Sequence, residues 1–468
     1  MKRSKHSLSH YHLTTFDMGQ LIPVANVEVL PGDSFRWQTS ALIRVTPQLK
    51  PLMHPVTVRI HHFFVPYRLV WSGWEDFITN KSAGTYPVIS GGAHSEGALH
   101  DYLGIYNDAS NDYSALHTRA YNMIYNEYYR DKDITSEVSE DTDTIQNICW
   151  EKDFATASRA SPQQGTAVSL PLGTSAPVHT PGNAGSTIYV ESDAASGTRN
   201  LDSSAGDLLL DSTGAGNSAN VLYANLNDAT AATIAQLREA MQLQKFAEAR
   251  QNWGEEYVDY LRYLGIRPSD ARLQRPEYLA GGKQTIAFSE ILNTTGANTP
   301  GAMVGHGISA VRSNRFKRFF EEHGVVMSMM SVRPKTLYAN GIPKKFNRTD
   351  YDDYYQRELE VIGDEAVLNK EVYSADSGPT DTLGYSPRYY SYRSESSYVS
   401  AEMRNSTNYD FHMGRIFGGD VALNDSFIEC TPTKRAFADQ SEDSLWVMVN
   451  HSIQARRQVR KYPGYGGF

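Results

Sequence analysis

Three short clusters of basic residues are the groups in this sequence best suited to binding another molecule. They comprise Lys2, Arg3 and Lys5 near the N-terminus, the run RSNRFKRFF at residues 312–320, and Arg456, Arg457, Arg460 and Lys461 near the C-terminus. Basic residues interleaved with aromatic residues can hold single-stranded nucleic acid, because the cations contact phosphates and the rings stack on bases. The alternative is a solvated or subunit-pairing surface. That alternative is preferred for the middle cluster, whose phenylalanines are expected to pack, and both interpretations stay open for the two ends.

No motif in the sequence predicts catalysis or a cofactor. The patterns of a phosphate-binding loop, a zinc protease, a serine-nucleophile turn and a redox C-x-x-C pair are all missing. Residues 305–310, GHGISA, match a dinucleotide-binding G-x-G-x-x-A, but no alternation of strands and helices surrounds them, so a flexible loop is the preferred interpretation. We therefore expect no enzyme activity and no cofactor.

The histidines do not predict a metal site. His61 and His62 are neighbours within a predicted strand, so their side chains point to opposite faces and cannot chelate one ion together. His10 and His12 share a face, but they lie in a polar segment without an acidic or cysteine partner. We therefore expect a chain without a bound metal.

The charge of the whole chain limits where nucleic acid can bind. The 468 residues carry a formal net charge of −9, so the chain is not a polycation and any contact with nucleic acid must be local. Cys149 and Cys430 are too few for a disulfide framework and indicate a reducing compartment, with one long-range bridge as the alternative. The basic N-terminus lacks the apolar stretch of a secretory signal, and no window approaches the about 18 to 20 apolar residues that span a bilayer.

Alternating apolar residues predict strands toward both ends of the chain. The strand expected at 54–65 has Val56, Val58 and Ile60 on one face, and we place it at the centre of the core. Other strands are expected at 20–31, 35–45, 286–288, 325–330 and 446–449. Pairing of these elements across a helical middle predicts one discontinuous, antiparallel β-domain over residues 1–468. An extended basic arm at 1–17 and a basic tail at 450–468 flank it.

Two amphipathic helices are expected in the middle of the chain. Residues 115–130 place tyrosines and Ile124 at helical spacing on one face, and Tyr121 and Tyr125 of this face are predicted to lie between subunits. The second helix begins at Thr233, which forms a capping box with Gln236. Its predicted inner stripe consists of Ile234, Leu237 and Met241, widened by Leu243 and Phe246.

Residues 173–232 differ in composition from the rest of the chain. Small and polar residues dominate the segment, and Arg199 is its only lysine or arginine. The short apolar runs at 187–190 and 208–210 predict small hairpins, which favours a surface-exposed functional insertion over a flexible linker. The alternative is a disordered segment that faces inward or lies in an interface.

Long segments of the sequence resemble the major capsid protein of Microviridae, the small tailless icosahedral phages with circular single-stranded DNA, and most of all its gokushovirus branch. The segments that carry the resemblance are LSHYHLTTFDMGQLIPV (8–24), VEVLPGDSFRWQTSALIRVTP (27–47), MHPVTVRIHHFFVPYRLVWSGWEDFI (53–78), RAYNMIYNEYYRD (119–131), AVSLPLG (167–173), PSDARLQRPEYLAGG (268–282), FEEHGVVMSMMSVRP (320–334) and AVLNKEVY (366–373). They cover nearly all of the chain. The sequence departs most from the family pattern in 173–232 and in the last sixty residues.

The resemblance implies a mainly β fold, an eight-stranded antiparallel viral jelly roll with long helix- and loop-containing insertions. It also implies a homo-oligomer of sixty subunits, a T=1 icosahedral shell around genomic single-stranded DNA. An internal scaffolding protein and a minor DNA-pilot protein are the implied partners, together with an unknown host surface receptor that the 173–232 insertion would meet near the threefold axes. We therefore expect a structural protein. A β-rich carbohydrate-binding or adhesion protein is the alternative, and an enzyme on the same scaffold is a third interpretation.

Overall fold

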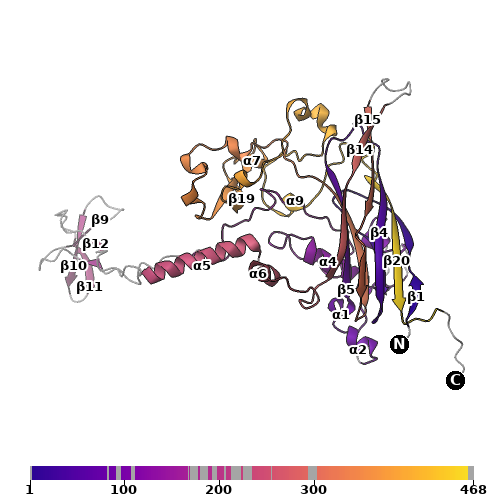
Figure 1. The fold of residues 1–468 in the computed structure, drawn as a ribbon. Coiled ribbons are helices and arrows are strands. Elements are labelled where there is room, and N and C mark those ends of the chain that lie inside the picture. The colour runs from indigo at the N-terminus through magenta and orange to yellow at the C-terminus, as the bar shows by residue number, and fades with distance from the viewer. Residues whose placement is uncertain are drawn as a thin grey trace. The chain divides into compact units, whose positions relative to one another are not determined.

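The chain folds into two compact units, one made of Met1–Pro162 with Asn252–Phe468 and the other of Gln163–Gln251 (Figure 1). The computed structural model describes residues 3–81, 84–90, 96–106, 111–166, 168, 178–179, 188–191, 198–204, 207–211, 223–224, 234–254, 256–292 and 303–461. No helix among these residues is long and apolar enough to cross a membrane.

A four-stranded antiparallel sheet forms the first layer of the larger unit. Its order is β13 (Glu277–Thr285), β5 (Val56–Pro66), β17 (Gly324–Pro334) and β3 (Leu21–Val29). The predicted strand at 54–65 is therefore confirmed as an inner strand, paired on both sides along most of its length. Both inner strands carry buried apolar side chains on both faces over part of their length, as expected for strands that are covered on both sides there.

A seven-stranded antiparallel sheet forms the second layer. Its main path is β1 (Ser4–Ser7), β20 (Leu445–Arg457), β4 (Ser34–Val45), β15 (Met303–Arg312) and β14 (Ala287–Leu292), while β2 (His10–Phe16) pairs with β20 and β16 (Phe316–Phe319) pairs with β4. The ends of the chain thus pair with each other, as the sequence predicted.

Two sequence predictions about this sheet are wrong. Most of the basic arm at 1–17 is not free, because β1 and β2 satisfy their backbone hydrogen bonds on β20. The GHGISA run is not a flexible loop but part of β15. Its glycines are needed for close packing, since a Cβ on Gly307 would lie 2.6 Å from a methyl group of Val45.

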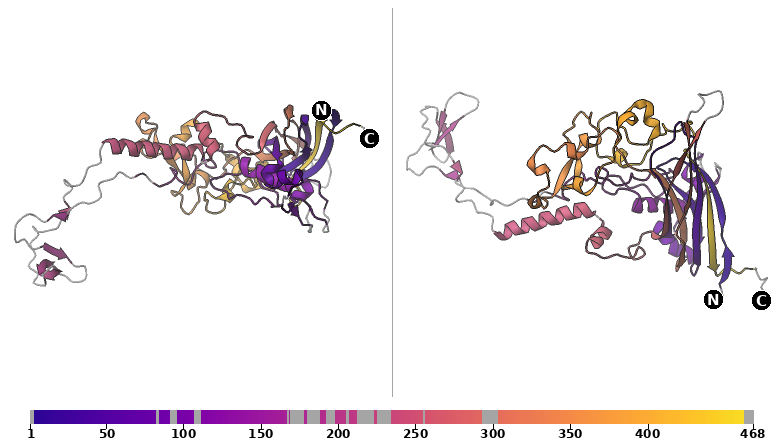
Figure 2. Two further views of the ribbon diagram at one scale, coloured as in Figure 1. Left: turned by 90° about the horizontal axis from the view of Figure 1, so that it is seen from below. Right: turned by 45° about the horizontal axis from the view of Figure 1, so that its top comes forward.

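The two sheets pack face to face and enclose the main core (Figures 1 and 2). Val58 and Ile60 of the first sheet share one apolar cluster with Ile43 and Val449 of the second. A neighbouring cluster joins Phe64 of β5 to the fully buried Trp37 of β4. Burial of these alternating apolar side chains is the main force that holds the layers together.

The helix α4 (Leu116–Tyr128) covers the outer face of the four-stranded sheet and confirms the helix predicted at 115–130. The interface role predicted for its tyrosines is not supported, because Tyr121 is 0% exposed and Tyr125 is 6% exposed within the single chain. The Tyr121 hydroxyl donates a hydrogen bond to the Leu21 carbonyl (2.8 Å) and accepts one from the Gln146 amide (3.0 Å). Helical spacing cannot distinguish such a core face from a subunit-facing one.

Short elements make up the rest of the larger unit. They are α1 (Tyr67–Val70), α2 (Trp74–Ile78), β6 (Val88–Ile89), α3 (Leu99–Tyr102), β7 (Tyr113–Ser114), α6 (Tyr257–Tyr263), β18 (Asp364–Leu368), α7 (Asn369–Val372), β19 (Thr382–Pro387), α8 (Tyr390–Arg393), α9 (Asp425–Ile428) and five 3-10 turns at Lys344–Phe346, Tyr351–Asp353, Arg357–Leu359, Ala401–Arg404 and Ser406–Phe411. The β18–β19 hairpin and α9 pack around a separate apolar cluster that includes Val367, Leu383 and Ile428.

The smaller unit contains the whole of the predicted insertion at 173–232. The two apolar runs form β9 (Ile188–Glu191) and β11 (Asp207–Asp211), both paired with β10 (Thr198–Ser204), and β8 (Val178–His179) pairs with β12 (Tyr223–Ala224). The predicted second helix is α5 (Ile234–Trp253), but no residue of its apolar stripe is buried. The predicted cap Thr233 and much of 173–232 lie outside the described residues.

Two buried histidines form hydrogen bonds inside the sandwich. The ring nitrogens of His62 lie 2.7 Å from the Ser328 hydroxyl and 3.1 Å from the Ser313 hydroxyl. The ring of His451 bonds the Thr39 hydroxyl and the Val24 carbonyl, both at 2.9 Å. Burial lowers the pKa of each ring from 6.5 to about 3, so both are neutral in the folded chain.

These histidines predict that the protein loses stability in acid. Their folded pKa lies below the unfolded value, so the unfolded chain binds protons first and the free energy of unfolding falls as pH drops below 6.5 toward 3. At pH 5 we expect a loss of about 2 kcal/mol for each histidine relative to pH 7.5. Denaturant unfolding at both pH values should show a smaller loss in His62→Gln and His451→Gln. Equal losses in the wild type and both variants would contradict the assignment.

Candidate nucleic-acid interface

Strand pairing brings the three basic clusters of the sequence onto one sheet face. Lys5 of β1 lies opposite Arg456 of β20, and Gln454 of β20 lies opposite Arg36 of β4. Arg36 in turn lies opposite Lys317 of β16. Neighbouring strands lie about 5 Å apart, so these side chains form adjacent positions on the sheet.

The alternation of the strands turns these cations outward. Phe35 and Trp37 on β4 point into the core, and Arg36 between them is exposed. On β20, Arg456 is exposed while its neighbour Ala455 is buried. We define the basic face as the exposed residues Lys5, Arg36, Arg312, Arg315, Lys317 and Arg456. Arg312 and Arg315 belong to it because both donate hydrogen bonds to the side-chain oxygen of Gln38, at 2.9 and 3.1 Å.

The charge of the basic face is not neutralised by carboxylates. Nearby Arg318 and Arg457 have acidic partners, Glu277 at 2.6 Å and Asp33 at 2.9 Å. Among the residues that the structure describes, no ion pair involves any of the six basic-face residues. Six exposed, unneutralised cations on one face create a local positive potential despite the net acidity of the chain, which suits a polyanion.

The structure divides the predicted N-terminal residues between different roles. Arg3 donates hydrogen bonds to the Gly32 carbonyl (2.8 Å) and the Ser34 hydroxyl (3.0 Å) and packs over Phe319, so it ties β1 to the sheet edge. Lys5 joins the basic face. Lys2 lies outside the described residues.

The predicted C-terminal residues are divided as well. Arg457 pairs with the fully buried Asp33 and secures the end of β20 to the turn between β3 and β4, so its role is structural. Arg456 joins the basic face, while Arg460 and Lys461 are exposed beyond the strand. Strand alternation explains why two adjacent arginines serve different purposes.

Sequence reasoning missed Arg36, and the structure places Lys317 of the middle cluster beside it. Arg36 is a single cation in an otherwise apolar and polar strand, and only its register with Lys317 makes it part of a cluster. In the middle cluster, Phe316 and Phe320 pack in the core as expected, but the same prediction is wrong for Phe319, which is exposed, and Lys317 is exposed as well. The alternation of apolar and basic residues at 316–318 was the available signal.

Aromatic and apolar side chains continue the face beyond the basic residues. Phe319 and Trp446 are exposed, and Leu13 of β2 lies opposite Met448 of β20, both also exposed. A cavity of about 1070 Å³ is lined by Leu13, Leu42, Trp446 and Met448, with Glu96, Asp101, Glu442 and Asp443 also in its wall. The exposed rings could stack on bases, but this end of the face also carries Arg44 and the four acidic residues, so it is mixed in character, whereas the other end is basic.

The described residues offer no alternative site for metal chemistry. No group of three or more His, Cys, Asp or Glu side chains among them is placed to hold an ion. The Nδ1 atoms of His10 and His12 lie 2.9 Å from the carbonyls of Leu8 and Val24, respectively. Both cysteines are free thiols.

Comparison with known proteins agrees with this reading of the sequence and the fold. The profile of the family described as "Capsid protein (F protein)" matches residues 1–464. Capsid protein VP1 of Bdellovibrio phage phiMH2K is 31% identical, over 93% of this chain and 89% of its own length. Capsid protein VP1 of Chlamydia phage 1 is 27% identical, over 99% of this chain and 96% of its own length. Capsid protein VP1 of Spiroplasma virus 4 is also 27% identical, over 86% of this chain and 83% of its own length. The chain therefore belongs to the phage capsid protein (F protein) family and is a structural protein of the virion rather than an enzyme.

Proposed function

We propose that sixty copies of this chain assemble into a T=1 icosahedral shell whose inner surface includes the basic face. The shell encloses a circular single-stranded DNA genome. The observation that carries the proposal is a set of six exposed cations on one sheet face, without carboxylate partners among the described residues. Contacts to phosphates from such a face are independent of sequence, as packaging of a whole genome requires.

The order of the strands supports an eight-stranded jelly roll as the framework of the subunit. Numbered along the chain, the eight main strands are β2, β3, β4, β5, β13, β15, β17 and β20. With these strands numbered one to eight, the four-stranded sheet has the order two-seven-four-five (β3, β17, β5, β13). The main strands of the other sheet have the order one-eight-three-six (β2, β20, β4, β15). These are the orders that two interleaved Greek keys produce, and β1, β14 and β16 extend the second sheet.

The basic face is tested by its contribution to the salt dependence of DNA binding. The variant Arg36→Gln, Arg312→Gln, Lys317→Gln, Arg456→Gln should bind single-stranded DNA more weakly than the wild type. The slope of log affinity against log salt should fall by about 0.7 for each lost phosphate contact, up to about 3. Fluorescence anisotropy with an oligothymidylate measures both.

A second variant with the same loss of charge serves as the control. Lys81, Arg262, Arg357 and Arg393 are exposed and lie outside the basic face, so their replacement by Gln should leave the slope nearly unchanged. If the two variants gave the same slope, the basic face would have no special role and its residues would be assigned to subunit contacts.

We also propose that an exposed aromatic surface in residues 346–398 contacts neighbouring subunits, in place of Tyr121 and Tyr125. Its exposed side chains are Phe346, Tyr351, Tyr354, Tyr355, Val361, Ile362, Tyr392 and Tyr398. Tyr351 is 79% exposed and Tyr398 is 63% exposed. Aromatic residues are enriched in subunit interfaces, and eight exposed large apolar side chains within this stretch of chain are consistent with such a contact.

Replacing these tyrosines should separate assembly from folding. We expect the double variant Tyr351→Ala, Tyr398→Ala to lower the yield of shells in electron micrographs while the subunit Tm stays close to that of the wild type. Tyr121→Ala should instead lower the stability of the subunit by about 3 kcal/mol or more, because it removes a fully buried ring. Wild-type shell yields from the double variant would contradict the interface.

The insertion at 173–232 is proposed to lie on the outside of the shell and to meet the host receptor. It falls within its own compact unit, and the α5 helix that follows has no buried residue. With Arg199 as its only lysine or arginine, it is unsuited to a wall that faces DNA. The resemblance to the family also supports an internal scaffolding protein and a minor DNA-pilot protein as partners.

Shortening the insertion tests its role. Replacement of 180–225 by a Gly-Ser linker should leave shell yield unchanged, because the strands of this unit pair with one another and not with the two large sheets. Attachment of particles to host cells should fall, as measured by adsorption assays. Loss of assembly would instead place the segment in subunit contacts, and unchanged attachment would remove its receptor role.

A further inference from the structure

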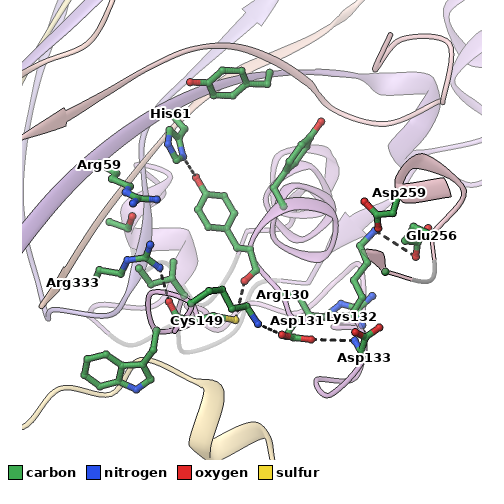
Figure 3. Close-up of a pocket in the computed structure, with 18 of the residues that line it drawn as sticks. Arg59, His61, Arg130, Asp131, Lys132, Asp133, Cys149, Glu256, Asp259 and Arg333 are labelled. Carbon is green, nitrogen blue, oxygen red and sulfur yellow. Dashed lines mark hydrogen bonds and ion pairs between the residues drawn. The ribbon is translucent and has the colours of Figure 1, made fainter. Parts of the chain in front are cut away.

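A second candidate binding site lies on the outer face of the four-stranded sheet, separated from the basic face by the sandwich core. It is a cavity of about 700 Å³ in the larger unit (Figure 3). Its walls come from strands β5, β13 and β17, from the segments at 128–133 and 148–152, and from Trp253, Gly254, Glu256 and Asp259. Neither the basic face nor the exposed aromatic surface shares a residue with it.

Two arginines on neighbouring strands point into this cavity (Figure 3). Arg59 of β5 lies opposite Ser331 of β17, so Arg333, two residues further along β17, is its diagonal neighbour on the same sheet face. Arg333 donates a hydrogen bond to the Cys149 carbonyl at 2.8 Å. The Nε atom of Arg59 is buried without a hydrogen-bond partner, although buried donors are normally satisfied.

Carboxylates do not neutralise this end of the cavity. Glu151 lies 3.5 Å from Arg59 and 3.1 Å from Lys335, and the charges of Arg333 and Lys283 also act on it. Burial alone would raise the pKa of Glu151. The hydrogen bond from Lys335 and the charges of the neighbouring cations outweigh this effect, so the pKa is lowered and the carboxylate is ionised. Burial, together with the charge of Arg59, lowers the pKa of Arg333. The single carboxylate of Glu151 is therefore surrounded by four cations, those of Arg59, Arg333, Lys283 and Lys335.

The acidic residues on the opposite side of the cavity are already paired. Asp131 forms ion pairs with Lys152 and Arg159, and Arg159 also pairs with Asp133. Lys132 lies 3.5 Å from Glu256. These charges balance one another locally, so the excess positive charge stays at the Arg59–Arg333 end.

We propose that Arg59 and Arg333 bind the phosphate group of a small organic phosphate in this cavity. Guanidinium groups bind phosphate oxygens through paired, charge-assisted hydrogen bonds, and a phosphate dianion offsets more of the excess charge than a single carboxylate would. A cavity of about 700 Å³ is larger than phosphate requires and lies in the range that holds organic ligands. The rings of Tyr129 and Tyr278 in its wall provide contacts for an organic body.

Calorimetric titration of the full-length protein tests the site. The probes are inorganic phosphate, thymidine 5′-monophosphate and glucose 6-phosphate, with thymidine and glucose as their unphosphorylated counterparts. We expect at least one phosphorylated probe to bind and its counterpart to bind at least tenfold more weakly. Binding of inorganic phosphate would show that the phosphate alone suffices, and preference for one ester would identify the organic body.

Variants of Arg59 link the binding to the proposed residues. Arg59→Gln should weaken binding of the phosphorylated probe at least tenfold. Arg59→Lys keeps the charge but loses the paired donors, so its affinity should lie between those of Arg59→Gln and the wild type. Arg68→Gln is the matched control, because the side chains of Arg59 and Arg68 are both 30% exposed and each faces one glutamate. Circular dichroism verifies folding. The proposal is overturned if no phosphorylated probe binds the wild type, or if Arg59→Gln and Arg59→Lys both bind as the wild type does.

Discussion

The pairing of β20 with β4 is the interaction on which the rest of the structure depends. It joins Leu445–Arg457, close to the C-terminal end, to Ser34–Val45 near the start of the chain, in an unbroken antiparallel register of twelve residue pairs. β20 also provides the template for β1 and β2. Without this ladder the second sheet would lose its centre and the sandwich core would lose one of its two walls. Such long-range pairing costs loop-closure entropy, which the buried apolar faces must offset.

The same ladder serves stability on one face and binding on the other. Val449 and Ile453 point inward and help to fill the core, while Gln454 and Arg456 point to solvent. Because the side chains of a strand alternate strictly, the cations cannot enter the core without a shift of register that would also expose the apolar residues. The register that builds the core therefore also fixes the position of the basic face.

Charge is distributed unevenly over this acidic chain. Two groups of cations outnumber the carboxylates around them, the basic face and the Arg59–Arg333 end of the cavity, and they lie on the outer faces of different sheets. Elsewhere, as at Asp131 and Asp33, buried acids are paired with basic side chains. This clustering of cations on two surfaces is the observation on which both proposed binding sites rest.

The sequence by itself determined the elements whose signals are local. Alternation located the strands that became β3, β4, β5 and β17, helical spacing located α4 and α5, and the apolar runs of the insertion located β9 and β11. Long ordered segments established the capsid family before any geometry was known. These signals suffice because backbone conformation and family resemblance follow from the order of neighbouring residues.

Only the tertiary structure decided what each side chain faces. It placed Tyr121 in the core instead of an interface, left the apolar stripe of α5 exposed, and incorporated the N-terminal arm into a sheet. It also separated Arg456, which is exposed, from Arg457, which secures a buried aspartate, and made the isolated Arg36 part of a cluster. These outcomes depend on the register between strands far apart in sequence and on what covers each face, and local patterns carry no information about either.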